Sequence, residues 1–302
     1  MEREVRCSYS RITNHLTMSL VLVTGATGFI GNYVVSSLLA EGHEVMATSG
    51  NAGKASTMDW YDKVSYKELN FEHLHAGTNY FEYFENPEKI IHLAWEGLPN
   101  YKSLFHFEIN LHRHYFFLKN LIVNGCRDVT VTGTCFEYGM KNGCLSEDMH
   151  TDPANPYALA KDTLNKFLHE LTKKESFTLK WVRLFYLFGK GQHPGSLLSQ
   201  LQNALDNNEE LFNMSGGEQV RDYLPVEKAA EFIVKTALQN NITGNINCCS
   251  GLPVTIREMV RDYMQKAGKK IELNLGYYPY PDYEPMAFWG DNKKLQQIIN
   301  EK

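Results

Sequence analysis

Several features are missing from this 302-residue sequence, and each absence excludes a class of protein. No apolar run approaches the ~20 residues that a membrane-spanning helix needs, so we do not expect a membrane protein. Basic residues do not outnumber acidic ones, and the net charge of −5 offers no basic face for nucleic acid. The sequence also has no internal repeat and no low-complexity segment. With 43% hydrophobic and 22% charged residues, it is typical of a soluble globular protein.

Cysteine is scarce as well. The six cysteines show no paired spacing typical of a metal site, and Cys248 and Cys249 are adjacent. We therefore expect no metal and free thiols in a reducing cytoplasm. Residues 1–17 carry three arginines but no apolar core, so we do not expect them to be a secretory signal. Met18 stands where such a protein would naturally begin, so residues 1–17 are predicted to be a peripheral arm, an expression scar or an upstream start, without an assigned function.

What the sequence does contain is a glycine-rich stretch, Val-Leu-Val-Thr-Gly-Ala-Thr-Gly-Phe-Ile-Gly, at residues 21–31. It predicts a buried strand, a tight turn and a helix over about 32–41. Such a turn presents backbone N–H groups and the positive end of a helix to a pyrophosphate. Gly25 permits the turn, Gly28 lets the backbone approach phosphate, and Gly31 lets helix and strand pack closely. The predicted cofactor contacts here are Gly25, Thr27, Gly28, Phe29 and Ile30.

The end of the next predicted strand, residues 43–48, bears on the choice of cofactor. An acidic residue there would bind a ribose 2′-OH and repel a 2′-phosphate. This sequence has Ser49, Gly50 and Asn51 instead, with Lys54 shortly after. Ser49, Asn51 and Lys54 are therefore predicted cofactor contacts, and NADPH is favoured over NADH.

Apolar segments continue to alternate with helical patterns, which predicts a parallel sheet. Further strands are predicted at 64–69, 89–94, 129–132 and 180–186. Leu93 and Ala94 end the second of these, where a cofactor can lie against the backbone, and His92 before them is predicted to be a packed core residue. The helix predicted over 104–124 is unusually aromatic, which favours core on one side and a partner helix on the other.

Beyond residue 186 the alternation loosens, which predicts a second lobe. The expected fold is α/β, a Rossmann-type doubly wound parallel sheet with a smaller C-terminal substrate lobe. The dinucleotide-binding domain is expected to span 18–189 plus about 218–246. The substrate lobe is expected to span about 190–217 and 247–302.

Tyr157 and Lys161 lie four residues apart on a helix that opens with Asn155 and Pro156. The spacing places a phenol and an ammonium on one face. A positive neighbour stabilises a phenolate and lowers the pKa of the tyrosine, so we expect a proton donor and acceptor that works near neutral pH.

Taken in order along the chain, these motifs resemble the extended short-chain dehydrogenase/reductase family, in its nucleotide-sugar epimerase/dehydratase branch. The matching residues, spread from about Ser19 to the C-terminus, are Thr24–Gly31, His92–Ala94, Asn110, Thr134, Tyr138–Gly139, Tyr157, Lys161, Arg183 and Arg221–Tyr223. The resemblance implies that Thr134, Tyr157 and Lys161 are catalytic. Thr134 would hydrogen-bond a carbonyl oxygen, Tyr157 would supply a proton, and Lys161 would hold the tyrosine pKa down and anchor the cofactor ribose.

Some residues differ from the family pattern, and these differences limit which reaction we expect. Sugar-nucleotide dehydratases of this branch place Asp-Glu directly after the Ser/Thr position, where this chain has Cys135 and Phe136. Neither side chain can act as the required acid and base, so we do not expect dehydration. Tyr186 stands where many members carry asparagine, and the residues after Tyr223 also differ, which leaves the substrate lobe open. The substrate contacts expected from the resemblance are Trp95, Cys135, Phe136 and Arg221.

Stretches around His92, Thr134, Asn247 and Phe288 resemble bacterial dTDP-4-keto-6-deoxyhexose reductases. The resemblance implies NADPH-dependent reduction of a C4 ketone on a nucleotide-linked 4-keto-6-deoxyhexose, for surface polysaccharide such as O-antigen. It also implies a homodimer formed through the aromatic helix and the helix of Tyr157. Three alternatives stay open: a 4-epimerase with tightly held NAD, a CDP-sugar reductase of the abequose synthase type, and a dinucleotide-sensing scaffold. The scaffold is disfavoured because such relatives typically lose the tyrosine or the lysine.

Overall fold

The computed structural model describes residues 19–300, and the arm predicted at residues 1–17 lies outside them. Its centre is a seven-stranded parallel sheet with the order β11-β7-β5-β4-β1-β2-β3. The strands are β1 (Leu20–Thr24), β2 (Glu44–Ser49), β3 (Ser65–Glu68), β4 (Lys89–His92), β5 (Asp128–Thr134), β7 (Thr178–Leu184) and β11 (Gly244–Cys248). The order reverses direction between β1 and β4, which is the switch point of a Rossmann-type sheet.

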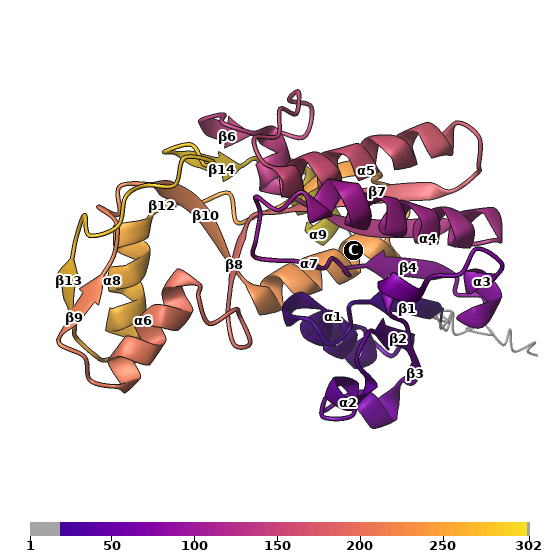
Figure 1. The fold of residues 1–302 in the computed structure, drawn as a ribbon, viewed down its shortest axis with the longest axis horizontal. Helices are drawn as coiled ribbons and strands as arrows, with labels where there is room; N and C mark the ends of the chain where they lie inside the picture. The colour runs from indigo at the N-terminus through magenta and orange to yellow at the C-terminus, as the bar shows by residue number, and fades with distance from the viewer. Residues whose placement is uncertain (1–18, 301–302) are drawn as a thin grey trace, which may run out of the picture.

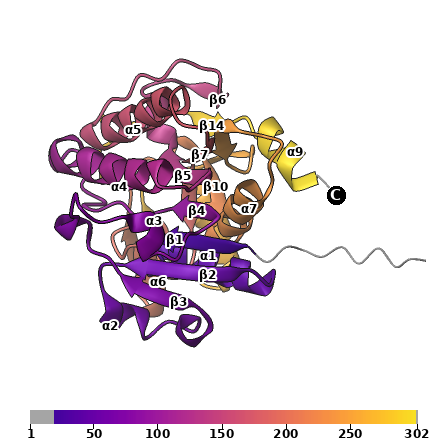
Figure 2. The same cartoon turned by 90° about the vertical axis from the view of Figure 1, so that its right-hand side faces the viewer.

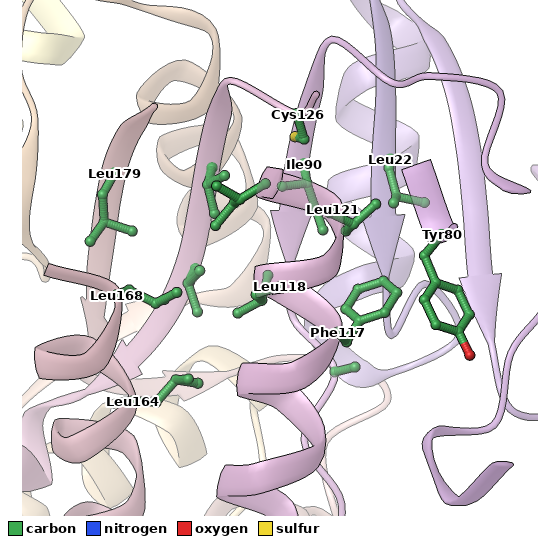
Figure 3. Packing of buried hydrophobic residues seen from close by; sticks show 14 of the residues in the cluster. Leu22, Tyr80, Ile90, Phe117, Leu118, Leu121, Cys126, Leu164, Leu168 and Leu179 are labelled. Atoms are coloured by element: carbon green, nitrogen blue, oxygen red, sulfur yellow. The ribbon is translucent and has the colours of Figure 1, made fainter. Parts of the chain in front are cut away.

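The two faces of the sheet are covered by different helices (Figures 1 and 2). These helices are α1 (Phe29–Ala40) and α7 (Val226–Leu238) on one face, and α4 (Leu111–Val123) and α5 (Pro156–Thr172) on the other. Strand β1 shows why both faces need cover, since Leu22 enters one core while Val21 and Val23 enter the other. In Figure 3, Leu118 of α4 and Leu168 of α5 lie over the strands in the first of these cores.

A smaller lobe stands apart from the sheet at the left of Figure 1. Its elements are α6 (Leu197–Asp206), β9 (Leu211–Asn213), α8 (Ile256–Ala267) and β13 (Glu272–Asn274). They enclose a separate apolar core that includes Leu201, Phe212 and Val260. A three-stranded sheet, β8 (Tyr186–Phe188), β10 (Val220–Pro225) and β12 (Pro253–Thr255), lies between this lobe and the large sheet.

The short remaining elements are α2 (Ala52–Ala55), α3 (Tyr80–Tyr83), β6 (Gly143–Leu145), β14 (Phe288–Gly290), α9 (Lys293–Asn300) and the turns η1 (Tyr61–Lys63), η2 (Phe71–His73), η3 (His106–Asn110) and η4 (Cys135–Tyr138). Helix α9 packs on α7 and β11 through Leu295 and Ile298. The range 247–302 predicted for the substrate lobe thus contains a helix that packs on the large sheet.

Local differences from the sequence-based expectation have simple causes. Helix α1 begins at Phe29 rather than at about residue 32, because Gly28 already takes the N-cap position. The aromatic helix expected over 104–124 opens with the π-helical turn η3 before α4 begins. Within residues 19–300 the five cysteines are free thiols, and no helix is long and apolar enough to cross a lipid bilayer.

Candidate active site

The glycine turn after β1 forms a cradle that only glycine permits. Gly25 has a φ of +69°, and a Cβ there would lie 2.8 Å from the backbone N of Ala94. A Cβ on Gly31 would lie 2.1 Å from the carbonyl oxygen of Gly25. No side chain caps the N-terminus of α1 at Gly28, so the N–H groups of its first turn remain available to a ligand. This arrangement fits the pyrophosphate of a dinucleotide.

Beside the cradle lies a cavity of about 230 Å³ at the carboxyl ends of β1, β2 and β4. The predicted contacts that line it are Gly25, Thr27, Gly28, Ser49, Leu93, Ala94 and Trp95. Register explains their convergence, because Thr24 pairs with both Thr48 and His92 and so brings the three strand ends to one edge. Asn51 and Lys54 do not line this cavity, and their contact with a cofactor stays a prediction.

A carboxylate from β3 lies beside the turn predicted to bind the ribose, and the sequence did not reveal it. Ser49 pairs with Glu68 in the β2–β3 register, and Glu68 Oε1 accepts a hydrogen bond from the backbone N of Ala52 at 3.2 Å. Asn51 Oδ1 is engaged as the cap of α2, where it accepts from the backbone N of Lys54 at 2.8 Å. The Lys54 side chain is exposed, and no carboxylate among residues 19–300 pairs with it. The turn therefore carries a lysine that pairs with no described carboxylate, and an acid from β3 lies beside it.

A second cavity, also about 230 Å³, lies over the end of β5 and the start of α5. Its lining includes the predicted residues Phe29, Ile30, Thr134, Cys135, Phe136 and Tyr157. Thr134 sits where β5 runs into η4, and Glu137 holds this turn by accepting a hydrogen bond from the Thr134 backbone N at 2.8 Å. Tyr157 follows Pro156 in the first turn of α5, which Asn155 caps. Thr134 and Tyr157 thus reach one cavity from separate elements.

The pKa of Tyr157 differs from the value expected from the sequence. The sequence predicts that Lys161 lowers it, but in the structure burial raises it, with further raising contributions from Tyr101, Glu137 and Cys135. A hydrogen bond with Thr134 lowers it only in part. The Lys161 ammonium instead lies over two indole rings, 4.4 Å from the Trp95 centroid and 5.6 Å from that of Trp181. Tyr157 is therefore a neutral phenol near pH 7, which suits a proton donor.

Beneath the cavity lies a buried charged pair that sequence reasoning missed. Glu137 is fully buried and accepts from Arg183 Nε at 2.7 Å and from Trp181 Nε1 at 3.0 Å. The same carboxylate holds the Thr134 backbone. The capping-box spacing from Thr134 to Glu137 was a local signal for it, whereas its pairing with Arg183 depends on β7 lying beside β5.

A chain of hydrogen bonds runs below the cofactor cavity. Thr24 Oγ1 accepts from the backbone N–H groups of Leu93 and Ala94, so its proton points to Nδ1 of His92 at 2.8 Å. His92 Nε2 then donates to His114 Nδ1 at 2.9 Å, and His114 Nε2 donates to Glu96 at 2.9 Å. Each ring is thereby a neutral imidazole, and burial lowers the pKa of both. His92 is confirmed as a buried core residue.

Two predicted substrate contacts, Trp95 and Arg221, do not line the Tyr157 cavity. Arg221 is 1% exposed, and its guanidinium binds Glu284 Oε2 at 2.8 Å and the backbone oxygens of Val220 and Met286. Trp95 lies on the Lys161 side, in the cofactor cavity. Their contact with a substrate stays a prediction, as does that of Cys135 and Phe136.

Comparison with known proteins agrees with this geometry. Residues 21–249 match the Epimerase family, described as the NAD dependent epimerase/dehydratase family. The chain is 28% identical over 273 residues to dTDP-6-deoxy-L-talose 4-dehydrogenase (NAD(+)) of Aggregatibacter actinomycetemcomitans, covering 89% of this chain and 98% of that protein.

Solved structures share the fold. The UDP-N-acetylglucosamine 4-epimerase of Methanobrevibacter ruminantium M1, in complex with UDP-N-acetylmuramic acid, superposes with a TM-score of 0.83 at 20% identity, covering 94% of this chain and 92% of that one. MoeE5 in complex with UDP-glucuronic acid and NAD gives 0.77 at 23% identity, covering 92% and 91%.

Proposed function

Because the chain belongs to the NAD dependent epimerase/dehydratase family, we propose that it reduces the C4 ketone of a nucleotide-linked 4-keto-6-deoxyhexose. The family makes it an oxidoreductase-type enzyme that acts on nucleotide sugars. The relative matched over 98% of its length is by name a 4-dehydrogenase of a dTDP-linked 6-deoxyhexose. The proposed reduction of the C4 ketone is the reverse of such a dehydrogenation at C4.

The observation that carries the proposal is the character of the Tyr157 cavity. None of its lining residues is charged, and aromatic and aliphatic side chains such as Phe29, Leu98 and Tyr101 predominate. An uncharged apolar wall suits the C6 methyl of a 6-deoxy sugar and disfavours the carboxylate of a uronic acid. Cys135 and Phe136 occupy the places of the dehydratase acid and base, and burial raises the pKa of Cys135 so that its thiol stays protonated.

The residues of the chain have distinct tasks in this reaction. A bound nicotinamide dinucleotide supplies the hydride that C4 receives. Tyr157 donates its phenolic proton to the carbonyl oxygen, and its raised pKa keeps that proton in place until it is needed. The Thr134 hydroxyl donates a hydrogen bond to the same oxygen and stabilises the developing charge. Lys161 lies on the same face of α5 as Tyr157, where its positive charge would hold a ribose hydroxyl of the cofactor.

The proposed reductant is NADPH. Ser49, Gly50 and Asn51 present no acid at the end of β2, and the exposed Lys54 can approach a 2′-phosphate. Glu68 favours NADH instead, because its carboxylate, which lies beside the Ala52 backbone N, can accept hydrogen bonds from a free ribose hydroxyl. The preference therefore depends on Lys54 outweighing Glu68.

The proposed assembly is a homodimer through α4 and α5, which lie side by side on the same face (Figure 2). Large apolar side chains on these helices remain exposed, including Val123, Leu159 and Phe167. Exposed residues of this kind are typical of an interface. We place the reaction in the cytoplasm, ahead of transfer of the sugar into a surface polysaccharide.

The test is incubation with NADPH and a panel of dTDP-, CDP-, GDP- and UDP-linked 4-keto-6-deoxyhexoses, followed by NMR of the product. Absorbance at 340 nm is expected to fall by one NADPH per sugar reduced, and the Tyr157→Phe variant serves as the inactive control. Conversion of a 4-hydroxy nucleotide sugar to its epimer without net absorbance change would instead establish the epimerase alternative. Turnover confined to CDP sugars would establish the CDP-sugar reductase.

A further inference from the structure

Lys161 is a buried cation without a carboxylate partner. The residue is 2% exposed, and within residues 19–300 no Asp or Glu lies within ion-pair distance of its ammonium. Burial without an ion-pair partner lowers the pKa of such an ammonium. The groups that do meet the ammonium are the faces of Trp95 and Trp181, with Nζ 4.4 Å and 5.6 Å from the ring centroids. Both distances lie within the range of cation–π attraction.

Each indole is held in place by its own hydrogen bond. Trp181 belongs to β7, is fully buried, and donates Nε1–H to both carboxylate oxygens of Glu137 at 3.0 and 3.1 Å. An N–H bonded to a carboxylate shifts electron density into the ring, which makes the face seen by the ammonium more negative. Trp95 donates Nε1–H to His106 Nδ1 at 3.2 Å.

The two histidines that contact Trp95, His106 and His114, are uncharged. His106 Nε2 donates to the carbonyl oxygen of Asn100 at 2.8 Å, so its Nδ1 is an acceptor and the ring is neutral. Trp95 also stacks on His114, with centroids 4.7 Å apart and an interplanar angle of 23°. His114 is neutral as well, because it receives a hydrogen bond on Nδ1 and donates from Nε2. Neither histidine therefore places a positive charge behind the indole to oppose Lys161.

We propose that Trp95 and Trp181 are positioning residues that hold Lys161 as a charged ammonium next to Tyr157. The inference rests on the catalytic role proposed for Lys161. The two rings supply attraction without an ion pair, so the ammonium stays free to meet a ribose hydroxyl. A carboxylate in their place would bind the ammonium directly and compete with that contact.

The pKa of Lys161 lies below its ordinary value and close to neutral pH. Burial lowers its pKa to about 8, against raising contributions from Glu137 and Glu96. The other titratable groups coupled to the ammonium are His92, His106 and His114, whose pKa values its charge lowers. The attraction of the two indole faces adds to these raising contributions and favours the charged ammonium.

The test measures the titration of Lys161 by NMR in protein labelled with ¹³C at the lysine ε carbon, with the resonance assigned by its loss in Lys161→Met. We expect a midpoint near pH 8 in the wild type. Trp95→Leu is expected to lower it by about one pH unit, the scale of a desolvated cation–π contact. Trp95→Phe, which keeps a weaker aromatic face, is expected to lie between the two.

Trp181→Phe tests the buried member, since it keeps an aromatic face but loses the N–H that polarises it. Trp60→Phe is the matched control, because Trp60 is equally buried but packs in the other core and donates to Asn32. An unchanged midpoint in folded Trp95→Leu and Trp181→Phe would overturn the inference, as would an equal shift in Trp60→Phe. The titration requires no sugar, so an enzyme that reduced no 4-keto sugar but titrated as expected would overturn the proposed function alone.

Discussion

Replacing Glu137 by glutamine is expected to destabilise the protein and disturb the turn of Thr134. The carboxylate accepts hydrogen bonds from Arg183 Nε, Trp181 Nε1 and the Thr134 backbone N while fully buried. Glutamine has nearly the same shape but offers only one acceptor oxygen, and its NH₂ group would meet another donor. Arg183 is 2% exposed, so its buried charge would be left without a carboxylate partner.

The size of the effect follows from that unpaired charge. Removing one member of a buried ion pair costs about 3–5 kcal/mol, mostly through the partner left behind. Arg183→Met is expected to cost a similar amount by leaving the buried Glu137 carboxylate without its cation. The double variant Glu137→Gln/Arg183→Met removes both charges, so we expect it to lose clearly less free energy than the sum of the two single variants.

The assay is urea denaturation of the wild type, both single variants and the double variant, followed by fluorescence and circular dichroism. A coupling free energy of about 2 kcal/mol or more between the two sites is expected from the cycle. Strict additivity, or a Glu137→Gln variant within about 0.5 kcal/mol of wild type, would refute the reasoning. Activity gives a second readout, because a displaced Thr134 is expected to lower kcat more than it affects binding of the dinucleotide.

Four further predictions concern the cofactor, the chemistry and the assembly. Tyr157→Phe is expected to lower kcat by ~10²–10⁴-fold with little change in NADPH affinity by fluorescence titration, and retention of more than about a tenth of the activity would exclude the general acid. Gly31→Ala is expected to abolish dinucleotide binding, since its Cβ would lie 2.1 Å from the Gly25 oxygen, whereas the control Gly77→Ala, with nothing within 4 Å, is expected to bind normally. Lys54→Ala is expected to lower the ratio of kcat/KM for NADPH over NADH and Glu68→Gln to raise it, and an unchanged ratio in both would show that this turn does not select the cofactor. Phe167→Asp on α5 is expected to convert a dimer into a 34.6 kDa monomer in light scattering, and a wild type already monomeric at micromolar concentration would contradict the proposed assembly.

Local chemistry was readable from the sequence. The glycines of residues 21–31 predicted the cradle because each tolerates a conformation or a contact that a Cβ forbids, and those constraints act within a few residues. The alternation of apolar strands and helices predicted the parallel sheet. The spacing of Tyr157 and Lys161 predicted one helix face, and α5 carries both.

Interactions between distant segments were decided only by the tertiary structure. The β2–β3 register brings Glu68 beside a turn that contains no acid in its own sequence. The packing of β7 against β5 sets Trp181 and Arg183 on Glu137. Arg221 matches a family motif, yet Glu284 binds its guanidinium from 63 residues away.

The pKa of Tyr157 shows the physical reason most clearly. The sequence predicts the charge of a neighbour four residues along a helix, but a pKa is set by every charge and by the depth of burial in three dimensions. For this phenol, burial outweighs the other contributions to the pKa. The ammonium of the neighbouring Lys161 lies over two indole rings, that of Trp181 in β7 and that of Trp95 after β4. The sequence alone thus determined which groups could do chemistry here, and the packing of the sheet determined how those groups are charged and what they touch.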